Sequence, residues 1–180
     1  PPVCVRLHLL CTTEWPSDMK HGGEPPLDKS RKAGAWLDLS TGINPLAYPL
    51  PELNSADWQS LPSGRNREAL LEAARAYYNI PEDTAIEAVP GTEAAINQLP
   101  DILPGPVAVA EPTYSSHRAA WSARGHEVYA HSPVAPAEAS QHLIVVNPNN
   151  PTGDLRPAEK LLKLAEGLLP NCVLIVDEAF

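Results

Sequence analysis

The sequence has 180 residues, enough for one domain with a substantial core, because single domains most often hold about 100 to 150 residues. Hydrophobic residues make up 43% of the chain and charged residues 19%, a balance that excludes a disordered chain and a membrane protein. The formal net charge of −9 is spread along the chain, which argues against a nucleic-acid partner, since phosphate binding needs a clustered basic surface.

The cysteines give little chemistry. Cys4, Cys11 and Cys172 include no CxxC pair, so they predict neither a disulfide framework nor a metal site. The apolar stretch over residues 3–11 is interrupted by polar side chains and is too short to span a bilayer. We read no export signal and expect a cytoplasmic protein.

The first part of the chain differs in pattern from the rest. Residues 1–60 are rich in Pro, Gly and Ser without a sustained period, which predicts an irregular N-terminal arm. Over residues 66–79 apolar side chains recur with the spacing of one helix face, and Pro81 ends the pattern. We therefore expect the arm over 1–60, a helix of a small segment within 61–80, and the first part of a larger domain over 81–180.

Strand and helix patterns alternate in the larger domain. Its short apolar runs are continuous, as strands covered on both faces must be. The predicted strands are 86–89, 107–110, 143–146 and 173–176, with 127–131 as a further candidate. The predicted helices are 92–99, 115–123 and 157–169. This alternation predicts an α/β fold with a doubly wound, mostly parallel sheet, which binds ligands beyond the carboxyl ends of its strands.

Polar or aromatic groups follow the first two predicted strands. Gly91, Thr92 and Glu93 stand at a helix N-terminus, where free N–H groups and the helix dipole favour a phosphate. The same pattern also fits Thr92 as a plain N-cap. Tyr114 follows the next strand and could either stack on a flat ring or pack in the core.

The last two strand ends are more informative. Residues 147–153 combine two prolines and a glycine, which fix a loop, with asparagine amides that can donate and accept hydrogen bonds. Asp177 follows four apolar residues and so lies at the edge of the core. A carboxylate there needs a cation or a hydrogen-bond donor as its partner.

These motifs carry a family resemblance. The run Asn147-Pro-Asn-Asn-Pro-Thr-Gly153, with a later strand ending in Asp177-Glu-Ala-Phe180, resembles the class I/II aminotransferase family of pyridoxal-phosphate (PLP) enzymes of fold type I. The resemblance implies that Gly91, Thr92 and Glu93 hold the cofactor phosphate. It also implies that Tyr114 stacks on the pyridine ring, Asn150 bonds the ring O3′, and Asp177 pairs with the protonated ring nitrogen.

The N-terminal arm resembles one branch of that family. His21-Gly22-Gly23 and residues 38–45 resemble the threonine-phosphate decarboxylase branch, and Phe180 stands where histidinol-phosphate aminotransferases usually carry tyrosine. The implied reaction is PLP-dependent decarboxylation of L-threonine O-3-phosphate to (R)-1-amino-2-propanol phosphate in cobalamin biosynthesis, by a homodimer. His21 and Asn44 are the implied contacts to the phosphorylated amino acid.

The sequence departs from the family in several places. Leu61 stands where relatives often have a tyrosine that reaches the cofactor phosphate, with Arg65 or Arg67 as conceivable substitutes. His117 could contact Asp177 or face solvent. The resemblance puts the Schiff-base lysine and the later arginine beyond Phe180, so the chain as given is expected to be an inactive part of the enzyme.

Three alternatives to the decarboxylase stay open at this point. One is a PLP-dependent aminotransferase, such as one for histidinol phosphate. Another is a non-catalytic truncated fragment. The third is a nucleotide-binding module, although no G-x-G-x-x-G or Walker pattern follows a predicted strand.

Overall fold

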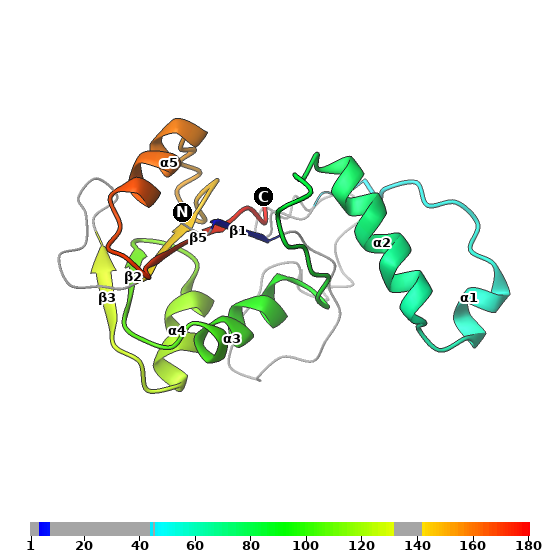
Figure 1. Ribbon diagram of the computed structural model, residues 1–180, viewed down its shortest axis with the longest axis horizontal. Coiled ribbons are helices and arrows are strands. Elements are labelled where there is room, and N and C mark those ends of the chain that lie inside the picture. The colour runs from blue at the N-terminus through cyan, green and yellow to red at the C-terminus, as the bar shows by residue number, and fades with distance from the viewer. Residues whose placement is uncertain (1–3, 8–43, 45, 132–141) are drawn as a thin grey trace, which may run out of the picture. The chain divides into compact units, whose positions relative to one another are not determined.

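The computed structural model describes residues 4–7, 44, 46–131 and 142–180. The chain divides into two compact units, one formed by Pro1–Thr12 with Ala85–Phe180 and the other by Thr13–Thr84 (Figure 1). The division expected near residues 60 and 80 remains a prediction. Among the described helices, none has the length and apolarity that crossing a bilayer would require.

A parallel sheet organises the larger unit, with the strand order β1-β5-β4-β2-β3. All four neighbouring pairs are parallel, which confirms the predicted fold class. The strands are β1 (Cys4–Leu7), β2 (Val107–Ala110), β3 (Val128–His131), β4 (His142–Val146) and β5 (Val173–Asp177). The helices are α3 (Thr92–Ile102), α4 (Ser115–Ala123) and α5 (Ala158–Glu166).

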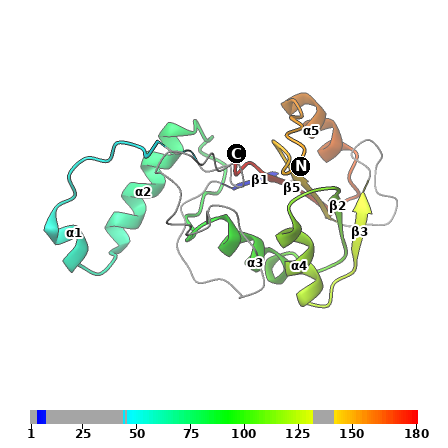
Figure 2. The same cartoon turned by 180° about the vertical axis from the view of Figure 1, so that it is seen from behind.

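Helices cover both faces of this sheet. Figures 1 and 2 show α3 and α4 on one face and α5 on the other. Alternate strand residues point to opposite faces, so each strand contributes to two clusters of buried side chains. The cluster under α3 and α4 contains Leu99, Val107, Val109, Trp121, Ile144, Val173 and Ile175. The cluster under α5 contains Ala108, Ala110, Leu143, Val145, Ala165, Leu174 and Val176.

The strand predicted at residues 86–89 is wrong. The segment is not assigned to the sheet. The Ala88 N–H donates to the Glu87 side chain at 3.0 Å, and the Gly91 N–H donates to the Val89 carbonyl at 2.8 Å. None of the four strand pairs of the described sheet includes residues 86–89.

The edge of the sheet beside β5 is instead formed by β1, which the sequence analysis did not predict. β1 lies within the segment expected to be irregular, and it pairs with β5 from Cys4 opposite Leu174 to Leu7 opposite Asp177. Four residues are too few to show a period, so a strand this short depends on its partner rather than on its own pattern.

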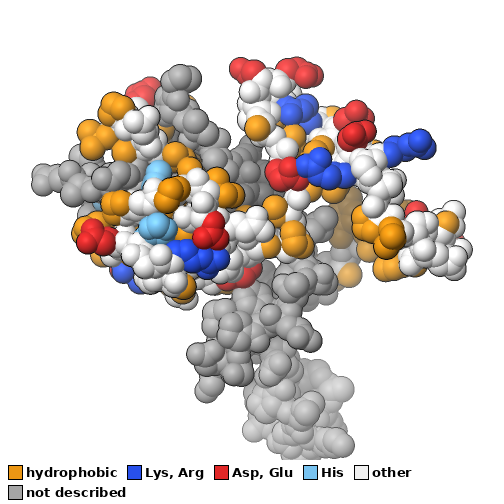
Figure 3. All heavy atoms as spheres, turned by 60° about the horizontal axis from the view of Figure 1, so that its bottom comes forward, with side chains coloured by type: hydrophobic (Ala, Val, Ile, Leu, Met, Phe, Trp, Pro, Cys, Tyr) orange, Lys and Arg blue, Asp and Glu red, His pale blue; other side chains and the backbone are white. Residues whose placement is uncertain are grey.

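The smaller unit contains α1 (Ser55–Gln59) and α2 (Gly64–Tyr77). α2 confirms the predicted helix, although both of its ends lie two residues earlier than expected. It begins early because Ser63 caps it, the Ser63 hydroxyl accepting from the Asn66 N–H at 3.2 Å. Neither helix buries a residue. In Figure 3, the acidic and basic side chains drawn for the described residues are interspersed rather than gathered by sign.

His142 introduces a titratable group into the core at the start of β4. The residue is 5% exposed, and its ring lies 5.7 Å from that of Trp121 between centroids. Its Nδ1 has no hydrogen-bond partner among the described residues. Burial lowers the pKa of His142 from its usual 6.5 because the charged imidazolium loses solvation, while the Pro104 carbonyl acts in the opposite direction.

This burial predicts a pH-dependent stability. Below about pH 6.5 the unfolded chain takes up a proton at His142 more readily than the folded chain does, so stability falls as pH decreases through that value. We expect His142→Gln to lose less unfolding free energy than the wild type between about pH 7.5 and 5.5. Chemical unfolding of the full-length protein at each pH, monitored by circular dichroism, measures the unfolding free energy. Equal losses in the two proteins would contradict the assignment.

Candidate functional site

The candidate site lies where the chain changes direction across the sheet. β2 leads through α4 to β3 on one side, whereas β4 leads through α5 to β5 on the other. The carboxyl ends of β2 and β4 therefore form the topological switch point, where open α/β sheets bind their ligands. All six residues predicted to bind the cofactor belong to the described part of the larger unit.

The start of α3 offers a cradle for an anion. Gly91 caps the helix with φ of 94°, a left-handed backbone that glycine adopts without strain. Thr92 is the first helical residue rather than the cap, and its Oγ1 is buried without a hydrogen-bond partner among the described residues. The first N–H groups of a helix also lack intrahelical acceptors, so this end can hold a phosphate.

Tyr114 connects this cradle to α4. The residue is half-buried at the cap of α4, and its hydroxyl donates to Glu93 Oε2 at 3.4 Å. Burial raises the pKa of the Tyr114 phenol, and the nearby Glu93 carboxylate raises it further. The hydroxyl therefore stays protonated near neutral pH, and the bond to Glu93 fixes where the ring lies.

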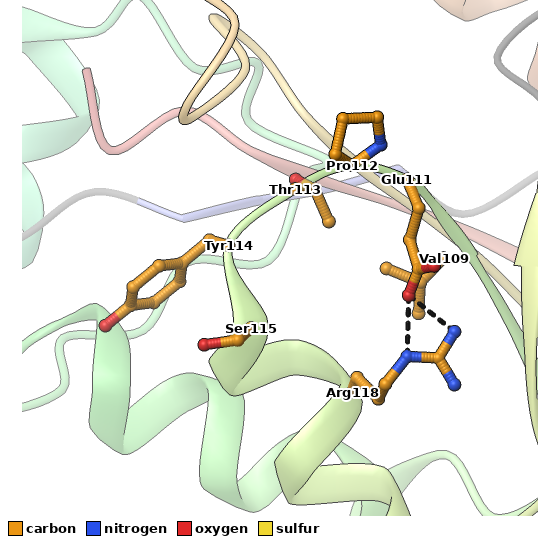
Figure 4. A pocket seen from close by; sticks show the side chains of 7 residues that line it. All are labelled: Val109, Glu111, Pro112, Thr113, Tyr114, Ser115 and Arg118. Carbon is orange, nitrogen blue, oxygen red and sulfur yellow. Dashed lines mark hydrogen bonds and ion pairs between the residues drawn. The ribbon is translucent and has the colours of Figure 1, made fainter. Parts of the chain in front are cut away.

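A pocket of about 250 Å³ flanks the same segment (Figure 4). It is lined by Val109, Glu111, Pro112, Thr113, Tyr114, Ser115 and Arg118. Arg118 is the cation in this lining, and its Nε donates to Glu111 Oε1 at 2.6 Å. Since Glu111 compensates this charge, the start of α3 is the better candidate for an anion site than this pocket.

Asp177 ends β5 as a buried carboxylate with a specific partner. It is 2% exposed, and its Oδ2 lies 2.8 Å from Nε2 of His117, which is fully buried. Asp177 Oδ1 accepts from the Ala179 N–H at 3.1 Å. The contact with His117 that the sequence suggested is present, and it offsets part of the cost of burying the carboxylate.

The loop after β4 is held by nested hydrogen bonds. Asn147 Nδ2 donates to the Arg156 carbonyl at 3.0 Å, and the Arg156 N–H donates back to Asn147 Oδ1 at 2.6 Å. Inside this bracket the Asn149 N–H donates to the Asp154 carbonyl at 2.8 Å. Asn150 lies in the turn so formed, and no hydrogen bond of its side-chain amide is found within the described residues.

The sequence analysis missed the residues that join the two loops. Thr113 Oγ1 donates to Asn149 Oδ1 at 2.7 Å, across 36 positions of the chain. Asn149 Nδ2 donates in turn to the Pro112 carbonyl at 2.9 Å. The sequence offered one signal for them, because Thr113 directly precedes Tyr114 and Asn149 directly precedes Asn150.

Neither residue expected to bind the substrate belongs to the described part of the larger unit. His21 lies outside the described residues. Asn44 belongs to the smaller unit, where its Oδ1 accepts from the Leu46 N–H at 2.9 Å. Leu61, in the same unit, is 89% exposed. Their roles therefore remain predictions.

The residues of the larger unit fit a phosphorylated pyridine cofactor. A chain of contacts links Glu93 to Asp177. Glu93 accepts from the Tyr114 hydroxyl, and the rings of Tyr114 and His117 meet edge to face with 6.4 Å between their centroids. His117 in turn contacts Asp177. This chain of contacts connects the start of α3, where the Thr92 hydroxyl has no partner among the described residues, with an aromatic ring and a buried carboxylate. These are the groups that a phosphate, a flat ring and a protonated ring nitrogen require.

The pair of His117 and Asp177 predicts a coupled loss of stability. His117→Phe leaves the carboxylate buried with one fewer partner, and we expect it to lower the unfolding free energy by about 1 to 3 kcal/mol. In a double-mutant cycle of apoprotein unfolding with Asp177→Leu, the combined loss should be smaller than the sum of the single losses. Additive losses would show that the two side chains do not act as a pair.

Comparison with known proteins identifies the family. The family "Aminotransferase class I and II" matches residues 37–180. Threonine-phosphate decarboxylase from a Sinorhizobium species is 39% identical over 170 residues, covering 89% of this chain and 50% of the relative. The decarboxylase of Pseudomonas aeruginosa is 39% identical over 153 residues, covering 81% of this chain and 44% of the relative. The chain thus spans about half the length of the curated relatives it matches.

A solved structure shows the same fold. Histidinol-phosphate aminotransferase from Sinorhizobium meliloti, in complex with pyridoxal-5′-phosphate, superposes with a TM-score of 0.54 at 17% identity. The match covers 69% of this chain and 37% of that one. Together with the sequence match over residues 37–180, the sheet and its strand-end motifs establish that the chain belongs to the class I and II aminotransferase family.

Proposed function

We propose that the full-length protein is a PLP-dependent decarboxylase that converts L-threonine O-3-phosphate to (R)-1-amino-2-propanol phosphate and carbon dioxide in cobalamin biosynthesis. The observation that carries the cofactor assignment is Asp177, a carboxylate 2% exposed at the end of β5 and held by His117. The substrate assignment is supported by the 39% identity to threonine-phosphate decarboxylase over 89% of the chain.

The start of α3 binds the cofactor phosphate in this proposal. The Thr92 hydroxyl, buried and otherwise unpartnered among the described residues, donates to a phosphate oxygen. The N–H groups of Thr92 and Glu93 donate alongside it, and the positive end of the helix dipole favours the charge. Gly91 permits the close approach of the backbone because it carries no Cβ.

The ring of the cofactor is held by residues from three strand ends. Tyr114 stacks on its face, and the side-chain amide of Asn150 donates to the ring oxygen O3′. Asp177 holds a proton at the ring nitrogen, while His117 keeps that carboxylate oriented. When bound, the cofactor supplies an electron sink for the bond that breaks at the substrate Cα.

The remaining roles complete the proposal. His21 and Asn44 contact the phosphorylated amino acid, and the enzyme acts as a homodimer in the cytoplasm. The proposal also keeps the arm over 1–60, of which β1 joins the sheet, and the segment 61–80, followed by the cofactor-binding domain over 81–180. An aminotransferase acting on a phosphorylated substrate is the second candidate, supported by the shared fold with histidinol-phosphate aminotransferase.

The products distinguish the two candidates. Full-length protein reconstituted with PLP and given L-threonine O-3-phosphate should release carbon dioxide without consuming 2-oxoglutarate. Carbon dioxide capture and an assay for glutamate measure both outcomes in one reaction. Stoichiometric formation of glutamate with no carbon dioxide would favour the aminotransferase.

The phosphate cradle predicts a second result. Thr92→Val keeps the shape of the side chain but removes the hydroxyl, and we expect PLP to bind the full-length apoprotein about 10-fold to 100-fold more weakly, since a hydrogen bond to a charged group is lost. Thr92→Ser retains a hydroxyl and should bind nearly as well as the wild type. Equilibrium dialysis measures the affinities. An unchanged affinity in Thr92→Val would place the phosphate elsewhere.

A further inference from the structure

We propose that Thr113 and Asn149 are positioning residues, whose hydrogen bond sets the spacing between the ring of Tyr114 and the amide of Asn150. This inference rests on the proposed function, because it assigns those two groups to the faces and edge of one cofactor. We call the bonds that Asn149 makes with Thr113 and Pro112 the loop clasp.

The loop clasp uses the whole side-chain amide of Asn149. Its Oδ1 accepts from Thr113 Oγ1 at 2.7 Å, while its Nδ2 donates to the carbonyl of Pro112 and to Thr152 Oγ1, both at 2.9 Å. An amide satisfied on both atoms is held in one orientation. The Thr152 hydroxyl is itself fixed, because it donates to Asp154 Oδ2 at 2.7 Å.

The sheet does not hold these loops together by itself. The pairing of β2 with β4 ends at Val109 opposite Ile144, whereas β4 and β5 continue in register to Val146 opposite Asp177. β2 and β4 therefore separate toward the switch point, where the ligand crevice opens. Beyond the last strand pair, the loop clasp ties the two loops across that crevice.

Each end of the clasp lies one residue from a group that contacts the ring in the proposal. Thr113 directly precedes Tyr114, and Asn149 directly precedes Asn150. Asn149 also has a fixed backbone, since its carbonyl accepts from the Gly153 N–H at 2.6 Å and its N–H donates to Asp154. Neighbouring Cα atoms are only about 3.8 Å apart, so a shift at either end of the clasp also displaces the backbone that carries the next side chain.

The experiment compares full-length apoproteins by their affinity for PLP and by the circular dichroism of the bound cofactor. Thr113→Val removes the donor and Asn149→Ala removes the acceptor. We expect Thr113→Val to weaken binding about threefold to tenfold, because one neutral hydrogen bond is lost, and Asn149→Ala to weaken it at least as much, because its bonds to Pro112 and Thr152 are lost as well. Both variants should change the dichroism because the ring tilts. Thr113→Ser keeps the hydroxyl and should restore both properties to within about twofold.

Matched variants separate positioning from general damage. Thr84→Val makes the same substitution at an exposed threonine of the smaller unit and should leave both measurements unchanged. The double variant Thr113→Val/Asn149→Ala should be no worse than the more severe single variant, because both break one clasp. If Thr113→Val does not fold, Asn149→Ala carries the same test from the other side.

The outcomes distinguish this inference from the proposed function. If the wild type binds no PLP, the proposed function fails. If the wild type binds PLP and both Thr113→Val and Asn149→Ala bind it with unchanged affinity and dichroism, the positioning role is overturned while the proposed function stands.

Discussion

The burial of Asp177 is the constraint around which the larger unit is arranged. A carboxylate that is 2% exposed at the end of β5 needs a partner, and the only long-range side-chain contact described for it comes from His117, 60 positions earlier in the chain. That contact requires α4 to begin directly above the sheet, which in turn brings Tyr114 to the same edge and toward Glu93 at the start of α3. One buried charge thus links three elements of the fold.

The two clusters of side chains below this edge explain why the sheet can support it. Alternate residues of β2, β4 and β5 pack under α3 and α4 or under α5, so the strands are covered on both faces. Each fully buried valine, leucine or isoleucine contributes about 1.5 to 3 kcal/mol. The polar groups stand where this packing ends, and the rigid sheet below keeps their positions relative to one another.

Sequence reasoning found those features that depend on a residue and its immediate place in the chain. Asp177 and Tyr114 could be singled out because each follows an apolar strand, and α2 because its apolar residues recur with the helical period. The strand β1 could not be found, since four residues become a strand through their partner β5. The strand predicted at 86–89 was wrong for the same reason, because the segment has the apolar composition of a strand but no partner strand in the described sheet. The bond from Thr113 to Asn149 depends on how β2 and β4 separate, which no local pattern reports.

The ion pair between Glu111 and Arg118 has a consequence for how a phosphorylated molecule would enter. A dianion approaching the switch point is attracted by any uncompensated positive charge, and a guanidinium is a strong competitor for phosphate. Arg118 already shares its charge with Glu111, and its Nη1 donates to the Val128 carbonyl at 3.3 Å. The guanidinium therefore competes weakly for the phosphate. This favours binding of the anion at the start of α3.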